Sequence, residues 1–256
     1  MISKLRGDRA AYDTIGRTYA GTRTPDRRIE HLIWRNFGDS QSVLNVGAGT
    51  GSYEPLDRTV VAIEPSMTMI AQRRVTSAPV VCGIGEALPF PEDSFDVAMA
   101  VLTVHHWTDQ IKGLHELRRV ASKRVVILTY DAEEADTFWL VRDYLPSNAR
   151  IDRTSLPKLD VYHSVFPNCT VQPVPIPHDC QDGFLCAFWK RPDAYLSPTV
   201  QAGISSFSVI PEKEVEHGLA ALEADLKSGR WAARNQELAS LRDKDFGYRL
   251  IVAETG

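Results

Sequence analysis

The chain has 256 residues, of which 43% are hydrophobic and 24% are charged, a composition typical of a folded protein with one sizeable core. Its 29 basic and 33 acidic residues give a net charge of −4, which argues against a polyanionic partner such as tRNA, DNA or an acidic membrane and favours a small-molecule substrate. No apolar run approaches the roughly 18 residues that a membrane-spanning helix needs. The four cysteines lack C-x-x-C spacing and the chain start lacks the pattern of a secretory signal, so we expect reduced thiols and a cytoplasmic protein.

The first predicted elements are two helices within residues 8–37, which we expect to form an amino-terminal cap over residues 1–40. The second helix should begin at Pro25-Asp26, a typical start signal. Apolar residues recur at helical spacing in both segments: Tyr12, Ile15 and Tyr19, then Ile29, Leu32, Ile33 and Phe37.

Residues 41–130 are predicted to form a parallel sheet with helices on both faces, because short apolar runs alternate with polar helical stretches. The crossover after the first strand has room for barely two helical turns, and Pro55 should leave only a stunted helix there. The predicted strands lie near residues 43–46, 60–63, 79–82, 95–101 and 124–129, and the predicted helices lie near residues 66–74 and 109–120.

Residues 131–240 no longer show this alternation. They are predicted to form an insertion rich in aromatic residues, with a proline-rich stretch at 167–177. An amphipathic helix at 211–230 and a closing strand within 241–256 follow. We see no linker long enough to separate domains, so we expect a single domain over residues 1–256. His178-Asp179-Cys180 with Cys186 lacks a second ligand pair at recognised spacing, and we expect no metal site.

A cofactor site is indicated where the first predicted strand ends. Residues 43–51 read VLNVGAGTG, and its glycines allow positive φ and close approach of a ligand to the backbone. Glu64 ends the next strand, where a carboxylate can accept hydrogen bonds from ribose hydroxyls. A dinucleotide fingerprint would have its last glycine where Ser52 stands, so the pattern favours a ligand without a pyrophosphate.

These residues resemble motif I of the class I S-adenosylmethionine-dependent methyltransferases, in the ubiquinone/menaquinone-biosynthesis-like branch. Further segments follow in the order that this family shows. Residues 60–69 resemble its second motif, residues 83–96 its adenine loop and fourth strand, and residues 97–109 the segment after it.

The resemblance implies a Rossmann-like α/β fold with a mostly parallel seven-stranded sheet, whose last strand is antiparallel at the sheet edge. It also implies S-adenosyl-L-methionine as cofactor and S-adenosyl-L-homocysteine as product. The residues that it places around the cofactor are Gly47, Ala48 and Gly49 at the methionine moiety, Glu64 at the ribose, Pro65 and Met69 at the adenine face, Ile84, Gly85 and Glu86 at the adenine edge, Leu102 after the fourth strand, and Tyr19 and Arg23 near the cofactor carboxylate. For Tyr19 and Arg23 the alternative is ordinary helix packing and a solvated charge.

Two positions depart from the family pattern. Asn45 stands where the family usually has an acidic residue that faces the cofactor's ammonium group. Ile84 stands where an aspartate often binds the adenine amino group, which leaves that edge to backbone carbonyls. We expect each change to remove one polar contact without removing the site.

His105 follows the fourth strand at its carboxyl end, where ligands bind in open α/β sheets, and is a candidate base. The alternative is a histidine that caps the helix beginning at Thr108-Asp109, and His106 is expected to be structural. The aromatic residues of the insertion either line an apolar acceptor pocket or belong to the core: Trp139, Phe184, Phe188 and Trp189.

We therefore predict a methyltransferase that acts on a small metabolite, apolar or aromatic in character. A tRNA-modifying methyltransferase, a nicotinamide-dependent oxidoreductase and a non-catalytic S-adenosylmethionine-binding regulator are the alternatives. The sequence leaves open the acceptor, the atom that is methylated and the oligomeric state.

Overall fold

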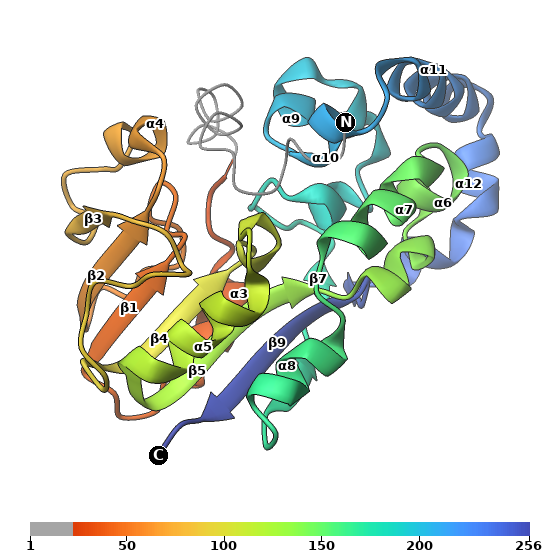
Figure 1. The fold of residues 1–256 in the computed structure, drawn as a ribbon. Coiled ribbons are helices and arrows are strands. Elements are labelled where there is room, and N and C mark those ends of the chain that lie inside the picture. The colour runs from red at the N-terminus through yellow and green to blue at the C-terminus, as the bar shows by residue number, and fades with distance from the viewer. Residues whose placement is uncertain (1–22) are drawn as a thin grey trace.

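A seven-stranded sheet is the centre of the computed structural model, which describes residues 23–256 (Figure 1). The strand order is β3-β2-β1-β4-β5-β9-β6. The first five strands along the chain pair in parallel, and β9 is antiparallel to both of its neighbours. The strands are β1 Ser42–Val46, β2 Thr59–Glu64, β3 Val80–Cys82, β4 Phe95–Val101, β5 Ala121–Tyr130, β6 Thr170–Pro173 and β9 Tyr248–Glu254. The Rossmann-like class predicted from the sequence is confirmed.

The antiparallel strand lies one position in from the edge at which the sequence analysis placed it. Strand β9 sits between β5 and β6, and β6 forms the outer edge. No strand was predicted for β6, which falls within the proline-rich stretch 167–177. It is short, its residues are exposed or half-buried, and Pro173 ends it, a residue that sheets tolerate at an edge. A second, two-stranded sheet pairs β7 Ile176–Pro177 with β8 Asp243–Lys244.

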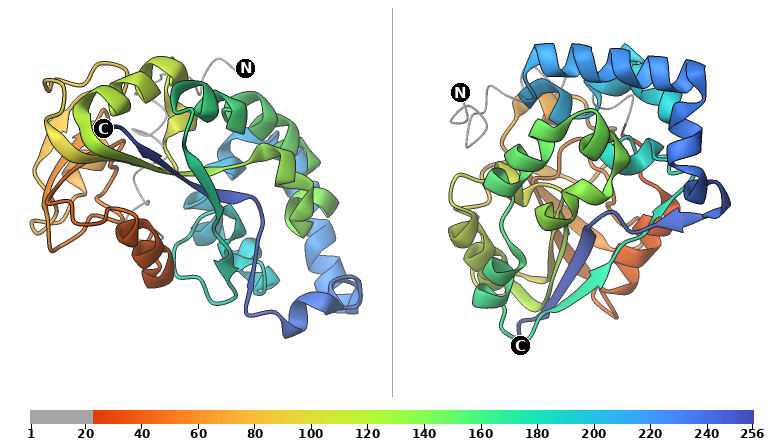
Figure 2. Two further views of the ribbon diagram at one scale, coloured as in Figure 1. Left: turned by 90° about the horizontal axis from the view of Figure 1, so that it is seen from below. Right: turned by 90° about the vertical axis from the view of Figure 1, so that its right-hand side faces the viewer.

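Helices cover both faces of the sheet, since side chains of successive strand residues point to opposite faces. Figure 2 (left) shows α3 on one side of the sheet and α5 and α8 on the other. One apolar cluster joins α3 and the insertion to Val43, Val97 and Val126, and the other joins α5 and α8 to Leu44 and Ala98. The helices of this core are α3 Arg27–Arg35, α4 Met67–Ala71, α5 Gln110–Val120 and α8 Leu159–Val165.

The remaining helices belong to the insertion, which stands beside the carboxyl ends of β4 and β5 (Figure 1). They are α6 Trp139–Asp143, α7 Pro146–Ser155, α9 Pro198–Ala202, α10 Ser206–Val209, α11 Glu212–Ser228 and α12 Arg230–Arg234. Short 3-10 helices are η3 Val104–His106, η4 Ala132–Thr137, η5 Leu185–Phe188, η6 Pro192–Leu196 and η7 Gln236–Ser240. No helix within residues 23–256 is long and apolar enough to cross a membrane.

Local sequence explains why α3 begins where it does and why no helix forms between β1 and β2. Helix α3 begins after Asp26, whose carboxylate accepts the backbone N–H of Arg28 at 3.0 Å, as its start signal predicted. The prediction of a short helix between β1 and β2 is wrong, because the chain connects these strands through turns alone. Tyr53 has a positive φ of 65° within them, which is incompatible with a helical turn.

Helix α11 packs closely against the end of α6 at Gly218. A Cβ at this position would lie 2.3 Å from the Tyr144 carbonyl oxygen. We expect Gly218→Ala to destabilise the protein by about 1–3 kcal/mol, although alanine is the better helix former by about 1 kcal/mol. Urea unfolding measures the change. The exposed Glu216→Ala in the same helix should stay within about 0.5 kcal/mol of wild type. A gain in stability for Gly218→Ala would contradict this packing.

Candidate active site

The glycine turn predicted from the sequence joins the carboxyl end of β1 to the crossover that leads to β2. Gly47, Gly49 and Gly51 have φ values of 70°, 53° and 97°, so all three adopt the left-handed conformation that glycine permits. The backbone N–H groups of Gly47 and Ala48 both donate to the carbonyl of Ile63, at 2.9 and 3.0 Å. The turn is therefore bonded directly to β2.

Gly47 also marks a close approach to the end of β4. A Cβ at Gly47 would lie 2.0 Å from the Thr103 hydroxyl oxygen. No other residue fits this contact without moving the segment that follows β4. The glycine turn and the carboxyl end of β4 are thus packed against each other.

Glu64 ends β2 beside the glycine turn, and only 6% of the residue is exposed. One carboxylate oxygen accepts the N–H of Gly49 at 2.8 Å, and the other accepts the N–H of Ser66 at 2.9 Å. Burial raises the pKa of Glu64, and these two hydrogen bonds act in the opposite direction. The structure thus brings together two of the predicted cofactor residues, while the ribose contact itself stays a prediction.

A buried ion pair lies beneath the turn and accounts for the departure at Asn45. The Glu54 carboxylate bonds to the Arg73 guanidinium at 2.7 Å, and both side chains are almost fully buried. Arg73 also donates to the carbonyl of Gly49 at 3.2 Å. Asn45, itself buried, donates its Nδ2 to the same Glu54 carboxylate at 3.2 Å. Since Asn45 is a donor here, a second carboxylate at position 45 would face Glu54 with like charge.

The predicted adenine side is held by packing. The Met69 side chain is buried against the turn, with its methyl carbon 3.3 Å from where a Cβ of Gly49 would lie. Pro65 is half-buried, whereas Ile84 is 42% exposed. Gly85 packs against Trp107, because a Cβ there would lie 2.7 Å from the indole ring. The adenine contacts of these residues stay predictions.

Glu86 has a structural role that the sequence analysis did not assign. Its carboxylate accepts the backbone N–H groups of Thr108 at 2.6 Å and of Asp109 at 3.3 Å. One carboxylate oxygen thus holds the segment before α5, and the adenine contact of Glu86 stays a prediction. The helix start expected at Thr108-Asp109 is confirmed, with Asp109 as the capping residue.

Arg23 is paired with a buried carboxylate that sequence analysis missed. Its guanidinium forms a two-point ion pair with Asp182, which is fully buried, and the Tyr53 hydroxyl donates to the same carboxylate at 2.7 Å. Nothing in the local pattern singles out Tyr53 or Asp182, because the three residues are far apart in sequence. Tyr19, the other predicted carboxylate ligand, lies outside the described residues.

A cavity opens at the carboxyl ends of β4 and β5, and we call it the acceptor pocket, after the role that we propose for it. Its lining comes from the segment after β4, from β5 and β9, and from the insertion, including α7. The lining residues include Leu102, His105, Tyr130, Asp152, Phe184 and Tyr248. Phe184 lines this cavity and is also part of the buried core, so both alternatives left open for it apply. The indoles of Trp139 and Trp189 are instead fully buried core groups that donate to the carbonyls of Trp189 and Ile176. Phe188 is half-buried and packs edge-to-face on Tyr195.

The segment after β4 combines backbone strain with two uncharged histidines. Leu102 has a φ of 50°, which a leucine adopts only under constraint, and such outliers are common at functional sites. Burial lowers the pKa of His105 to about 4, and the charge of Arg23 adds to the effect. The pKa of His106 is also well below its ordinary value, through burial and the neighbouring His105. Both rings are therefore neutral at physiological pH.

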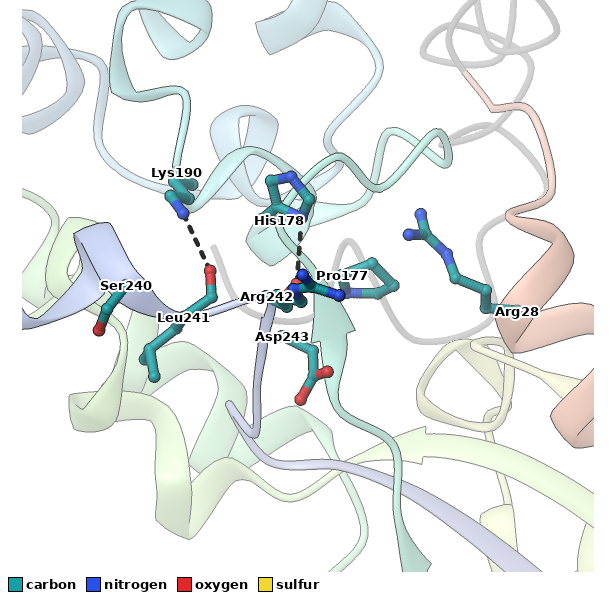
Figure 3. A pocket seen from close by; sticks show the side chains of 8 residues that line it. All are labelled: Arg28, Pro177, His178, Lys190, Ser240, Leu241, Arg242 and Asp243. Carbon is teal, nitrogen blue, oxygen red and sulfur yellow. Dashed lines mark hydrogen bonds between the residues drawn. The ribbon is translucent and has the colours of Figure 1, made fainter.

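A second, larger hollow lies on the surface between α3 and the β7–β8 sheet. Figure 3 shows that its basic side chains come from several segments, and those of Lys190 and His178 bond to backbone carbonyls at 2.9 and 3.1 Å. Arg28 forms ion pairs with Asp26 and Asp179. No residue of the glycine turn lines this hollow. Within residues 23–256, no group of three or more His, Cys, Asp or Glu side chains is arranged to hold a metal ion.

Substitutions at Asn45 and Glu54 test whether their contact stabilises the structure around the glycine turn. We expect Asn45→Asp to lower the free energy of unfolding by about 1–3 kcal/mol, because it places an unpaired carboxylate against Glu54 in a buried site. In the double variant Asn45→Asp/Glu54→Gln, donor and acceptor are exchanged. Its destabilisation should be smaller than the sum of the two single effects, measured by urea unfolding. Strict additivity would show that these side chains do not interact.

Comparison with known proteins places this geometry in a family. A family model described as "Methyltransferase domain" matches residues 44–129. A crystal structure of a protein from Anabaena variabilis ATCC 29413, proposed to be a methyltransferase of an antibiotic biosynthesis pathway, superposes with a TM-score of 0.84 and 34% sequence identity, covering 91% of this chain and 98% of that one.

Curated relatives match over a shorter stretch. The ubiquinone/menaquinone biosynthesis C-methyltransferase UbiE of Stenotrophomonas maltophilia is 29% identical over 44% of this chain and 54% of its own length. The demethylmenaquinone methyltransferase of Corynebacterium kroppenstedtii is also 29% identical, over 43% of this chain and 52% of its own length. The chain thus spans about half the length of these curated relatives.

The donor set around the glycine turn fits S-adenosylmethionine. Gly47 and Gly49 present bare backbone, and Glu64 offers a buried carboxylate at the end of the adjacent strand. The Anabaena variabilis structure matches this chain along nearly its whole length at 34% identity, so the similarity includes the insertion as well as the glycine turn. The chain therefore belongs to the class I S-adenosylmethionine-dependent methyltransferases, and its cofactor is S-adenosylmethionine.

Proposed function

We propose that this protein transfers a methyl group from S-adenosylmethionine to a small apolar or aromatic metabolite held in the acceptor pocket. One observation carries the proposal: the segment after β4 joins the two sites. Thr103 packs on Gly47 of the glycine turn, while its neighbours Leu102 and His105 line the acceptor pocket. The cofactor supplies the reactive methyl group, so the protein has to hold donor and acceptor side by side and exclude water.

The walls of the pocket support an apolar or aromatic acceptor. The ring of Tyr248 lies 4.7 Å from that of Phe184 and 5.0 Å from that of Tyr130, measured between centroids. Aliphatic side chains of the insertion, such as Ile151 and Ile204, add to this apolar part of the lining. The lining also has a polar part, which consists of Arg23, His105, His106, Asp152, Ser155, Ser205 and Ser206. The apolar part favours a ring compound over a strongly polar one.

The cofactor half of the proposal is tested by calorimetry with S-adenosylhomocysteine. We expect Glu64→Gln to weaken binding by roughly 10- to 100-fold, because hydrogen bonds to a charged carboxylate contribute about 1.5–3 kcal/mol. The exposed Glu92→Gln is the matched control and should bind like wild type. NAD should give no heat. Absence of heat from both S-adenosylmethionine and S-adenosylhomocysteine would contradict the proposal.

A methyl-transfer screen against a metabolite extract, with products read by mass, tests the acceptor half. A new methylated small molecule is the expected result. Binding of S-adenosylhomocysteine without any methylated product would instead support a non-catalytic cofactor-binding regulator. Methylated tRNA in place of a metabolite would support the nucleic-acid alternative.

His105 is the proposed proton acceptor, if the acceptor atom must lose a proton. Because its pKa is about 4, the ring is neutral above about pH 5 and is able to take up a proton. We therefore expect kcat at saturating acceptor to fall as pH decreases toward 4, where His105 becomes charged. His105→Ala should lower kcat by roughly 10²- to 10⁴-fold on the acceptor that the screen identifies. Unchanged turnover would eliminate this role.

A further inference from the structure

We infer that the acceptor carries a proton-donating hydroxyl or amine group, and that Tyr130 and Asp152 bind this group inside the acceptor pocket. The inference rests on the proposed function, because it names the chemistry of the molecule that the pocket takes. It adds two residues to the site that motif comparison did not single out.

Tyr130 supplies the first observation. It ends β5, lines the pocket and is only 7% exposed. Its hydroxyl is buried and has no hydrogen-bond partner among residues 23–256. Buried polar groups in folded proteins are almost always paired, since an unpaired one is costly. A polar group of a bound molecule gives this hydroxyl its partner.

Asp152 supplies the second observation, from a different element of the pocket wall. It lies on α7 and lines the same pocket as Tyr130. One of its oxygens accepts the Nδ2 of Asn148 at 2.7 Å, and within the described part of the chain the other accepts no hydrogen bond. A donor on the acceptor molecule can therefore reach a carboxylate oxygen that the protein leaves open.

The charges around Asp152 are directed elsewhere. Arg153, next to it in sequence, bonds to Asp136 on the surface, and Arg23 across the pocket is paired with Asp182. Burial raises the pKa of Asp152 to about 7, as expected for a carboxyl group without a close cationic partner. A proton donor in the pocket stabilises the charged carboxylate, so the environment of Asp152 favours hydroxyl or amine compounds over hydrocarbons.

The rest of the pocket restricts the molecule that carries this group. The rings of Tyr130, Tyr248 and Phe184 contact one another in the pocket lining, to which the Tyr130 hydroxyl and Asp152 add polar groups. An aromatic ring with one hydroxyl or amino substituent satisfies both parts of the lining. Phenol and aniline represent the two possible substituents, and toluene is a hydrocarbon of similar size.

Binding of these three probes to the full chain loaded with S-adenosylhomocysteine tests the inference, with ligand-observed NMR as the measurement. We expect phenol or aniline to bind roughly 3- to 10-fold more tightly than toluene, the range that one net hydrogen bond provides. Comparison of phenol with aniline then tells which donor the pocket prefers. Toluene is the more apolar compound, so burial alone would give the opposite order.

Variants assign the preference to the two residues. Tyr130→Phe and Asp152→Asn should each reduce it while leaving toluene affinity unchanged. Tyr162→Phe is the matched control: Tyr162 is also buried, but its hydroxyl is 3.0 Å from that of Thr129 and it does not line the pocket. This control should keep the preference of wild type.

Two results would overturn the inference: toluene binding as tightly as both polar probes, or a preference that survives in both Tyr130→Phe and Asp152→Asn. The calorimetric titration with S-adenosylhomocysteine separates this failure from that of the proposed function. A protein that binds S-adenosylhomocysteine but does not distinguish the probes retains its proposed activity and loses only Tyr130 and Asp152 as acceptor ligands. The same titration shows that each variant is folded.

Discussion

The buried carboxylate of Asp182 is the contact on which the arrangement of the site depends. It takes a two-point ion pair from Arg23, 159 residues earlier, and a hydrogen bond from Tyr53, 129 residues earlier. Removal of one partner from such a buried group leaves an uncompensated charge, which is strongly destabilising. Since Tyr53 belongs to the crossover after β1 and Asp182 to the insertion, this carboxylate links the insertion to the segment that follows the glycine turn.

The two sides are built by different means. The cofactor side relies on backbone: left-handed glycines, N–H groups bonded to Glu64, and the Glu54–Arg73 ion pair that supports the turn from below. The pocket relies on side chains, many of them from the insertion, with apolar and polar groups mixed in its lining. A constant cofactor needs a rigid backbone frame, whereas an acceptor is selected by the side chains that surround it. This division matches the sequence, in which recognisable motifs are confined to the first half of the chain.

Local patterns in the sequence were sufficient to predict β1 to β5, the glycine turn and the position of Glu64. Strands β1, β2, β4 and β5 each contain a largely apolar run, and the turn requires residues that tolerate positive φ. The sequence of β6 shows no such pattern. An exposed edge strand does not need an apolar run, and it tolerates proline. Its presence also moved the antiparallel strand inward from the predicted edge.

Contacts between distant segments were beyond local patterns. Tyr53 and Asp182 carry no spacing that relates them, and Glu86 gives no sign that its carboxylate is used at the start of α5. The aromatic residues of the insertion show the same limit: Phe184 lines the pocket, whereas Trp139 and Trp189 are core, and all three look alike in sequence. Asn45 was correctly identified as a departure, but its reason lies in Glu54, nine residues away in a crossover of irregular shape.

The position of β9 has a consequence for how the chain matures on the ribosome. Its register joins β5 on one side to β6 on the other, so β6 has no sheet neighbour until residues 248–254 have been synthesised. Until then the nascent protein presents β5 as an open hydrogen-bonding edge, a surface prone to pairing with other chains. Completion of the sheet, and with it the placing of Tyr248 in the pocket wall, therefore requires β9, the last of its strands along residues 23–256.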